Sequence, residues 1–106
     1  MNILYLNRES GFDYIALVNQ LGNSDAIALP KEFRELNVVI SDISGGSVKV
    51  QWSLSDRAAV DGDVAIWHDW THQDVLDFSQ HTFDMPIRYL RVLANDEVEY
   101  TFEILS

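Results

Sequence analysis

The stretch that decides the fold is residues 36–54, LNVVISDISGGSVKVQWSL, which centres on two adjacent glycines, Gly45 and Gly46. Before the glycines, apolar residues occupy every second position until Asp42, where the apolar positions change to the other face. Glycine adopts the positive φ angles of a two-residue hairpin turn at little cost, so the pattern predicts a β-hairpin that turns at the glycine pair. After the glycines the alternation resumes, as in a half-buried strand, with Val48, Val50, Trp52 and Leu54.

A second alternating segment lies at the C-terminus. Residues 98–104 alternate apolar and polar side chains, and the turn residues Asn95 and Asp96 separate them from the apolar run at 87–94. This pattern predicts a C-terminal hairpin with an acidic outer face formed by Glu97, Glu99 and Glu103. Large apolar side chains on a patterned face are usually buried. We therefore expect five residues of the two hairpins to be in the core: Val50, Trp52, Leu54, Tyr100 and Phe102.

The rest of the chain contains short strand patterns between turn residues. Strands are predicted at residues 3–6, at 12–18 with little exposure on either face, at 26–29, at 64–70 and, as an edge strand, at 75–83. Residues 31–35 are the one segment expected to form a helical turn, and residues 56–63 are expected to form a loop with Val60 beneath it. No helix is long enough to cross over between parallel strands. The sequence predicts one all-β domain, residues 1–106, folded as an antiparallel β-sandwich of jelly-roll type with about eight short strands.

The composition is that of an acidic globular domain. Hydrophobic residues make up 47% of the chain, and 17 acidic against 7 basic side chains give a formal net charge of −10. A nucleic-acid binder needs a cationic surface, so we expect no nucleic-acid partner, and an acidic surface suits docking to a basic partner. The absence of cysteine excludes disulfides and zinc-thiolate sites. No segment approaches the roughly 20 apolar residues of a membrane helix, and residues 1–7 lack a basic leader.

Candidates for a metal site are few. His68 and His72 are four positions apart, the spacing of a helical zinc pair, but their local pattern is a strand that runs into a turn. The acidic residues around this region lack the full calcium-loop pattern, so calcium stays an open alternative for Asp56, Asp61, Asp63 and Asp69. No catalytic triad, carboxylate pair or phosphate-binding glycine loop is singled out by spacing. We expect no enzyme, no cofactor and no metal needed for folding.

The tryptophans and two arginines are the other informative residues. Trp67 and Trp70 fall on opposite faces of a regular strand, unless a bulge brings them together. An exposed tryptophan beside polar groups is typical of a sugar platform or a protein-interface hot spot, whereas the structural alternative is that both close the end of the sandwich. Arg88 and Arg91 also lie on opposite faces of their strand, so one of them is expected to point inward or toward a rim and to tie down a loop.

Four segments follow one another in a distinctive order: residues 48–56 (VKVQWSLSD), 67–70 (WHDW), 85–92 (MPIRYLRV) and the final alternating strand. Together they resemble a recurring type of small bacteriophage virion protein, of the head-decoration or head-to-tail accessory kind. In that type a valine-x-valine, polar pair and tryptophan layout precedes a Pro-x-x-x-x-Arg strand and a closing hairpin. The same order is similar to discoidin-like galactose-binding jelly rolls, although this chain is shorter and lacks their cysteines and a convincing set of sugar-binding loops. The resemblance covers residues 36–106 and implies no catalytic residue.

The resemblance implies a non-enzymatic structural protein of a virion, located in the particle, which decorates or stabilises the capsid or neck as a homo-oligomer. The face with Glu97, Glu99 and Glu103 is not expected to pack against a copy of itself, and deletion of residues 1–6 is expected to leave a folded monomer.

The alternative functions are a carbohydrate-binding module that stacks a glycan on Trp67 or Trp70, and an acidic nucleic-acid-mimicking inhibitor. Interface centres are depleted in charge and enriched in aromatics, so the contact candidates are Ile3, Leu4, Tyr5, Leu6, Trp67 and Trp70.

Overall fold

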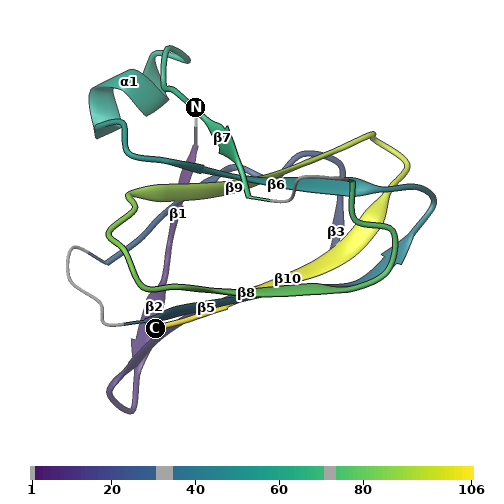
Figure 1. Ribbon diagram of the computed structural model, residues 1–106, viewed down its shortest axis with the longest axis horizontal. Helices are drawn as coiled ribbons and strands as arrows, with labels where there is room; N and C mark the ends of the chain where they lie inside the picture. Colours follow the sequence, from purple (N-terminus) through teal and green to yellow (C-terminus); the bar gives the residue numbers. More distant parts are fainter. Residues whose placement is uncertain (1, 31–34, 71–73) are drawn as a thin grey trace.

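Two five-stranded β-sheets face each other in the computed structural model, which describes residues 2–30, 35–70 and 74–106 (Figure 1). Sheet A has the strand order β1-β4-β9-β6-β7, and sheet B has the order β2-β3-β10-β5-β8. The elements are β1 (Ile3–Tyr5), β2 (Asn7–Glu9), β3 (Phe12–Leu21), β4 (Ala26–Ala28), β5 (Leu36–Ser44), β6 (Val48–Ser53), α1 (Arg57–Asp61), β7 (His68–Asp69), β8 (Ser79–Phe83), β9 (Tyr89–Ala94) and β10 (Glu99–Leu105).

The topology is that of a jelly roll. Without β1 and β2, the order is β3-β10-β5-β8 in one sheet and β4-β9-β6-β7 in the other. Each connection between consecutive strands from β3 to β10 crosses from one sheet to the other, except the one from β6 to β7. The strand pairs are antiparallel, with β1 and β4 as the parallel exception. The predicted all-β sandwich of jelly-roll type is confirmed.

The glycine pair has a different role from the one predicted. The strands on either side of it lie where the sequence places them, but β5 pairs with β10 and β8, whereas β6 pairs with β9 and β7. The predicted hairpin was therefore wrong, because the chain crosses from sheet B to sheet A at the glycines. A Cβ atom on Gly45 (φ +88°) would lie 2.7 Å from the carbonyl oxygen of Glu97, and one on Gly46 would lie 2.8 Å from a methyl group of Val98. Glycine is needed here because this connection packs against the connection between β9 and β10.

The predicted C-terminal hairpin was wrong for a related reason. β9 belongs to sheet A and β10 to sheet B, so the turn at Asn95 and Asp96 also joins the two sheets. Alternation along a strand indicates which face is buried, but it carries no information on which strand lies alongside. In a jelly roll, consecutive strands commonly enter opposite sheets while each keeps one face toward the shared core.

Two β-bulges lie on either side of β10. The change of face predicted at Asp42 is one of them, since Asp42 has a φ angle of 53° and two residues of β5, Asp42 and Ile43, oppose Tyr100 of β10. The other lies on β3, where Asn19 has a φ angle of 52° and the register with β10 shifts in the same way. Both flank Thr101, whose hydroxyl oxygen accepts a hydrogen bond from the Asn19 N–H at 3.4 Å. Bulges increase the local twist of a sheet and so help sheet B to curve over the core.

The space between the sheets is filled by apolar side chains. Of the predicted core residues, Val50, Tyr100 and Phe102 are fully buried, Trp52 is half-buried against the core, and the prediction for Leu54 was wrong, because Leu54 is 52% exposed. Strand β6 ends at Ser53, one residue before Leu54. Burial raises the pKa of the Tyr100 hydroxyl. The largest fully buried side chains are Tyr100, Phe102, Ile27, Leu36, Ile40, Leu90, Ile104, Val38, Val48, Val50, Val60 and Val92.

The segment predicted as a loop at 56–63 contains the helix α1. Asp56 caps its first turn, with a side-chain oxygen that accepts a hydrogen bond from the Ala59 N–H at 2.9 Å. Val60 is buried beneath it, as predicted. A five-residue helix spans little more than one turn, which is too short for a periodic signal. The helical turn expected at residues 31–35 falls largely on 31–34, outside the residues that the structure describes.

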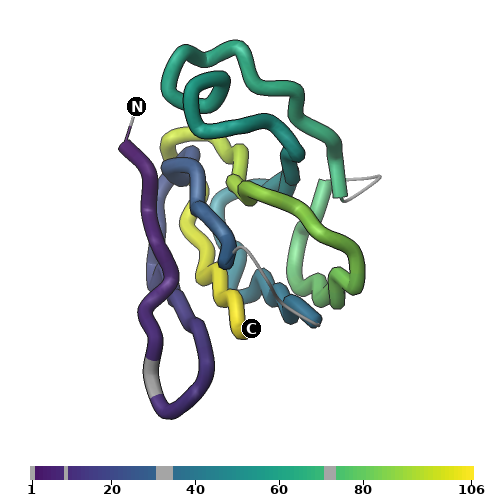
Figure 2. Tube along the Cα trace, turned by 90° about the vertical axis from the view of Figure 1, so that its left-hand side faces the viewer, coloured from purple at the N-terminus to yellow at the C-terminus, as the bar shows by residue number. Residues whose placement is uncertain are grey.

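The two side edges of the sandwich are formed by different segments. At one edge the N-terminal strand joins both sheets, since β1 pairs with β4 and β2 pairs with β3, and it runs along the side of the sandwich in Figure 2. Leu4 and Leu6 pack against the core from this strand. The expectation that deletion of residues 1–6 leaves a folded monomer does not fit this arrangement. β7 and β8 form the other edge, where β8 is the edge strand predicted at 75–83 and β7 is the two-residue remainder of the strand predicted at 64–70.

Candidate functional site

The six predicted contact residues do not form one surface. Leu4 and Leu6 are partly buried against the main core, whereas Tyr5 is 53% exposed and its hydroxyl accepts a hydrogen bond from Arg57 of α1 at 2.6 Å. Ile3 and Trp67 both pack against a small cluster under α1 that consists of Ala26, Val60 and Tyr89. Trp70 lies apart from them, at the β7–β8 edge. Much of the apolar area of these residues therefore serves the fold.

Trp67 is held in place by Arg91. The guanidinium of Arg91 lies 4.1 Å from the centre of the Trp67 ring, and its Nε donates a hydrogen bond to Gln51 Oε1 at 2.9 Å. Burial lowers the pKa of Arg91, while the nearby carboxylate of Asp63 raises it. The predicted arginine that ties down a loop is thus Arg91, which fastens the segment between α1 and β7 to the outer face of sheet A. The same stacking occupies one face of Trp67 and makes it a poor sugar platform.

Three of the four acidic residues considered for calcium, Asp56, Asp61 and Asp69, have structural partners. Asp56 caps α1, and Asp61 pairs with Arg57 at 3.5 Å. Asp69 accepts a hydrogen bond from Gln51 at 2.7 Å and lies 3.6 Å from the ammonium of Lys49. Among residues 2–30, 35–70 and 74–106, no three His, Asp or Glu side chains are grouped as metal ligands would be. His72 is outside these ranges, so the expectation that His68 and His72 do not form a zinc pair stays a prediction.

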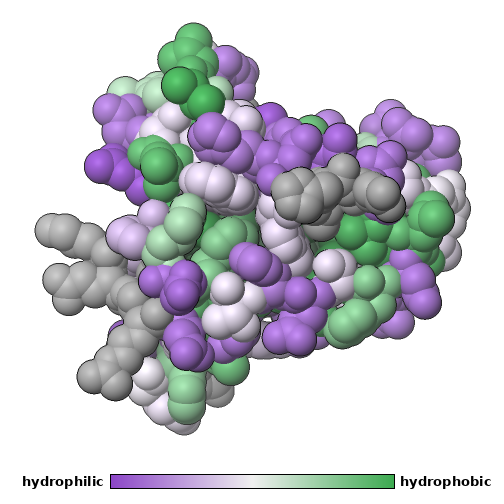
Figure 3. Space-filling model, in the orientation of Figure 1, coloured by the Kyte–Doolittle hydropathy of each residue, from purple (hydrophilic) through white to green (hydrophobic). Residues whose placement is uncertain are grey.

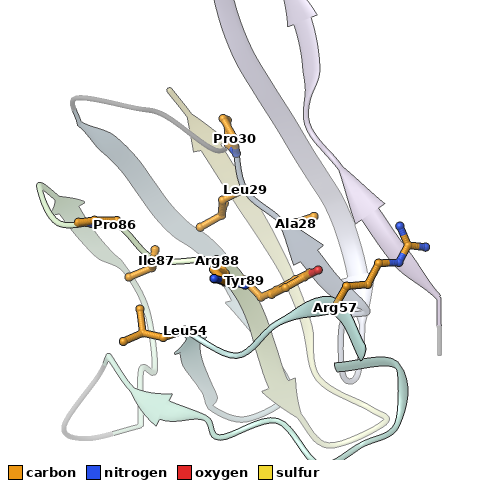
Figure 4. Close-up of a pocket in the computed structure, with 9 residues that line it drawn as sticks. All are labelled: Ala28, Leu29, Pro30, Leu54, Arg57, Pro86, Ile87, Arg88 and Tyr89. Atoms are coloured by element: carbon orange, nitrogen blue, oxygen red, sulfur yellow. The ribbon is translucent and has the colours of Figure 1, made fainter. Parts of the chain in front are cut away.

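A groove of about 650 Å³ opens at the end of the sandwich (Figure 4). Tyr89 extends toward Arg57 at one end of it, whereas Leu54, Pro86 and Ile87 lie together at the other. Arg57 is engaged by Tyr5 and Asp61, which both raise its pKa. The nine described residues that line it include no carboxylate, histidine or serine, the side chains that most often act as a general base or nucleophile. They are Ala28, Leu29, Pro30, Leu54, Arg57, Pro86, Ile87, Arg88 and Tyr89.

A second cavity, of about 250 Å³, lies at the β7–β8 edge and is called here the aromatic notch. Trp70 is at its centre, with ring centres 5.3 Å from His81 and 6.0 Å from Phe83. Trp52, which stacks on His68 at 4.6 Å, supplies another wall. Its residues come from both sheets and the loops next to them, and they are Trp52, Asp69, Trp70, His81, Phe83, Asp84 and Met85.

The outer face of sheet B carries a row of exposed apolar side chains, called here the β3 stripe: Phe12, Tyr14, Val18 and Leu21, which are 55%, 37%, 66% and 57% exposed. The prediction of little exposure on either face of residues 12–18 was therefore wrong. Leu105 of β10 is 39% exposed opposite Tyr14 and extends the row. The neighbouring Glu103 accepts a hydrogen bond from the Tyr14 hydroxyl at 3.2 Å. The apolar residues of the β3 stripe can be seen in the sequence, but their pattern is that of a strand buried on both faces.

Other exposed apolar side chains are spread over several loops. They lie after β6, between α1 and β7, and on both flanks of β8, and they are Leu54, Val64, Ile66, Leu76, Phe78 and Met85. On the side shown in Figure 3, hydrophobic patches alternate with hydrophilic ones. Singly exposed apolar residues are normal on protein surfaces. The β3 stripe differs because its members follow one strand.

The fold and these surfaces define a jelly-roll domain without an evident catalytic group in its described part. No protein-family model matches the chain, and no curated protein matches it. Among solved structures the chain is similar to Drosophila melanogaster CENP-C, in its crystal structure bound to CAL1, at 12% identity and a TM-score of 0.45 over 95% of this chain and 75% of that one. A similarity this distant carries no information on function. No helix in the described ranges is long and apolar enough to cross a membrane.

Proposed function

We propose that this protein is a non-enzymatic structural protein of a bacteriophage virion, which decorates or stabilises the capsid or the neck as a homo-oligomer. The observation that carries the proposal is the β3 stripe. Contiguous exposed apolar side chains are uncommon on monomeric proteins and typically mark a contact surface. The virion role in this proposal rests on the resemblance of residues 36–106 to small phage proteins.

The interior supports a structural role rather than a ligand-binding one. In the described part of the chain, the buried polar residues Ser53 and Thr101 both have hydrogen-bond partners within the protein: the Ser53 hydroxyl donates to the Ile66 carbonyl at 2.7 Å, and Thr101 accepts from Asn19. The buried Tyr100 hydroxyl likewise donates to the Gly22 carbonyl at 2.7 Å. Jelly rolls form viral capsid and lectin domains as well as enzymes, so the fold alone does not decide between these functions.

The charges on sheet B restrict how copies can associate. Glu99 and Glu103 belong to β10, which lies next to β3 in the sheet, whereas Glu97 precedes β10. Like charges that face each other oppose association. Glu103 pairs with Ala16 of β3 and accepts a hydrogen bond from Tyr14, so it lies beside the β3 stripe on the same outer face of sheet B. A contact between copies through the β3 stripe therefore departs from the expectation that the face with Glu97, Glu99 and Glu103 does not pack against a copy, and it would have to keep these carboxylates apart.

The virion role is tested on particles from the source of the sequence. In a density gradient, the protein should band with intact particles and stay with them through washing at moderate salt. A protein that remains in the soluble fraction, with particles that lack it, contradicts the virion role. Self-association is a separate property and is tested separately below.

A carbohydrate-binding module is the second candidate, and the aromatic notch favours it. Trp70 and Trp52 line a cavity with carboxylates at its rim, an arrangement that can stack a sugar ring and bind its hydroxyl groups. A glycan array distinguishes this function, with Trp70→Ala as the loss-of-binding variant. The site rests on Trp70 rather than Trp67, because Arg91 covers one face of Trp67.

A nucleic-acid-mimicking inhibitor has less support. Such a protein needs carboxylates in one continuous stripe. Here Glu99 and Glu103 lie on β10 in sheet B, Asp61 lies on α1 and pairs with Arg57, and Asp69 and Asp74 share Lys49. These carboxylates are divided among separate parts of the surface.

A further inference from the structure

The aromatic notch has the walls of a site for a cation. The rings of Trp70, His81 and Phe83 lie within 4.4 to 6.0 Å of one another, and their planes are inclined by 40° to 77°. These distances are those of rings in direct contact, so a cation would lie against the open side of the cluster, within about 6 Å of a ring centre, rather than between the rings. At about 250 Å³ the cavity is smaller than typical pockets for drug-sized ligands, so it suits one side chain rather than a longer ligand.

Two carboxylates give the notch negative charge. Asp69 and Asp84 line it, and no lysine or arginine is among its seven lining residues. Asp69 is fixed by Gln51 and already lies 3.6 Å from the Lys49 ammonium, so this corner of the molecule holds one cation of its own. In the part of the chain that the structure describes, Asp84 forms no ion pair. Its exposed carboxylate is placed to bind an incoming cation.

We propose that the aromatic notch binds the cationic side chain, arginine or lysine, of a basic partner protein. The net charge of −10 would attract such a partner over long range, and the aromatic walls with Asp84 would give the local contact. The protein contains an example of the same chemistry, since Arg91 lies 4.1 Å above the ring of Trp67. The proposal does not depend on the virion role or on the β3 stripe.

The test is a titration of the full chain with N-acetylargininamide and N-acetyl-lysinamide, followed by NMR of the tryptophan indole N–H groups. The neutral analogue N-acetylcitrullinamide has almost the shape of the arginine probe without its charge and serves as the matched ligand control. Salt at about 0.15 M shortens the range of electrostatic attraction to about 8 Å and suppresses loose association with the acidic surface. We expect the Trp52 and Trp70 signals to move with at least one cationic probe, while the Trp67 signal and the citrulline titration show no change.

Variants separate the notch from general attraction to an acidic protein. Asp84→Asn should weaken binding by about threefold or more, the scale of an exposed ion pair, and it keeps the size of the side chain. Asp77→Asn removes the same charge from an exposed position outside the notch and should leave the affinity unchanged. Equal loss in both variants, an Asp84→Asn variant that binds like wild type, equal binding of citrulline, or shifts with glucose or galactose but not with the cations would each overturn the proposal.

Discussion

The two outer faces of the sandwich differ in what covers them. On sheet A, α1 and the segment that follows it lie over the strands, so that Ala26 and Tyr89 are buried and Arg91 is half-buried against the ring of Trp67. On sheet B, nothing in residues 2–30, 35–70 or 74–106 covers the β3 stripe, and Val18 is 66% exposed. The chain thus covers one apolar outer face with its own residues and leaves the other to solvent or to a partner.

The difference indicates that the exposure of the β3 stripe is not forced by the small size of the domain. A helix and a loop cover the outer face of sheet A, and they are held there by the Asp56 cap and by Arg91. An uncovered apolar row on the other sheet is then best explained by a contact with another protein molecule. The predictions below test each half of this comparison, from the largest expected effect to the smallest.

An aromatic residue on each face gives the most direct contrast. Tyr89→Ala removes a ring buried under α1 and should lower the free energy of unfolding by about 3–5 kcal/mol. Phe12→Ala removes a ring that is 55% exposed and should change the stability of the monomer by no more than about 0.5 kcal/mol. Chemical denaturation at low protein concentration measures both. Similar losses in the two variants would mean that the stripe is part of the fold rather than a free surface.

The connection between the two sheets is the next test. Gly45→Ala should lower the free energy of unfolding by about 2–3 kcal/mol, because the residue has a positive φ angle and a Cβ atom would press on the Glu97 carbonyl. Gly11→Ala is the matched control, since Gly11 has a φ angle of +84° but nothing within 4 Å of the added Cβ, and should cost about 1 kcal/mol. Equal costs measured by denaturation would contradict the close packing of the two connections.

The smallest effect concerns the cover of sheet A. Asp56→Ala removes the cap of α1 and should lower stability by about 1 kcal/mol, with faster hydrogen exchange at the Ala59 amide. Asp77→Ala, an exposed aspartate outside α1, should lie within about 0.5 kcal/mol of wild type. If exchange at Ala59 is unchanged in Asp56→Ala, the capping bond does not fasten the cover.

Local patterns in the sequence predicted the faces of individual strands. The alternation around Val50 and Phe102 identified buried positions, and the break at Asp42 marked a real bulge. Sequence could not show which strands pair, because Gly45 is explained by a contact with Glu97, a residue far along the chain. The jelly-roll class follows from the number and length of strands, but its pairing does not.

The candidate surfaces were harder to predict than the fold. Trp70 was identified, but its neighbours His81 and Phe83 belong to another sheet and no local spacing connects them. The β3 stripe was missed because apolar residues on both sides of a strand predict burial, and only the absence of a cover on sheet B distinguishes it. The notch thus depends on contacts between different sheets, and the stripe depends on a missing cover, and neither can be seen in a local sequence pattern.

The central claim is that the β3 stripe is a contact surface between copies, and sedimentation velocity over a wide concentration range tests it most directly. Val18→Asp places a charge in the middle of the stripe, and Val64→Asp makes the same change at a residue that is 72% exposed on the loop after α1. We predict that wild type and Val64→Asp form the same oligomer, whereas Val18→Asp stays monomeric with an unchanged melting temperature at low concentration. A wild-type protein that is monomeric at every concentration, or an oligomer that Val64→Asp disrupts as strongly as Val18→Asp, would contradict the claim.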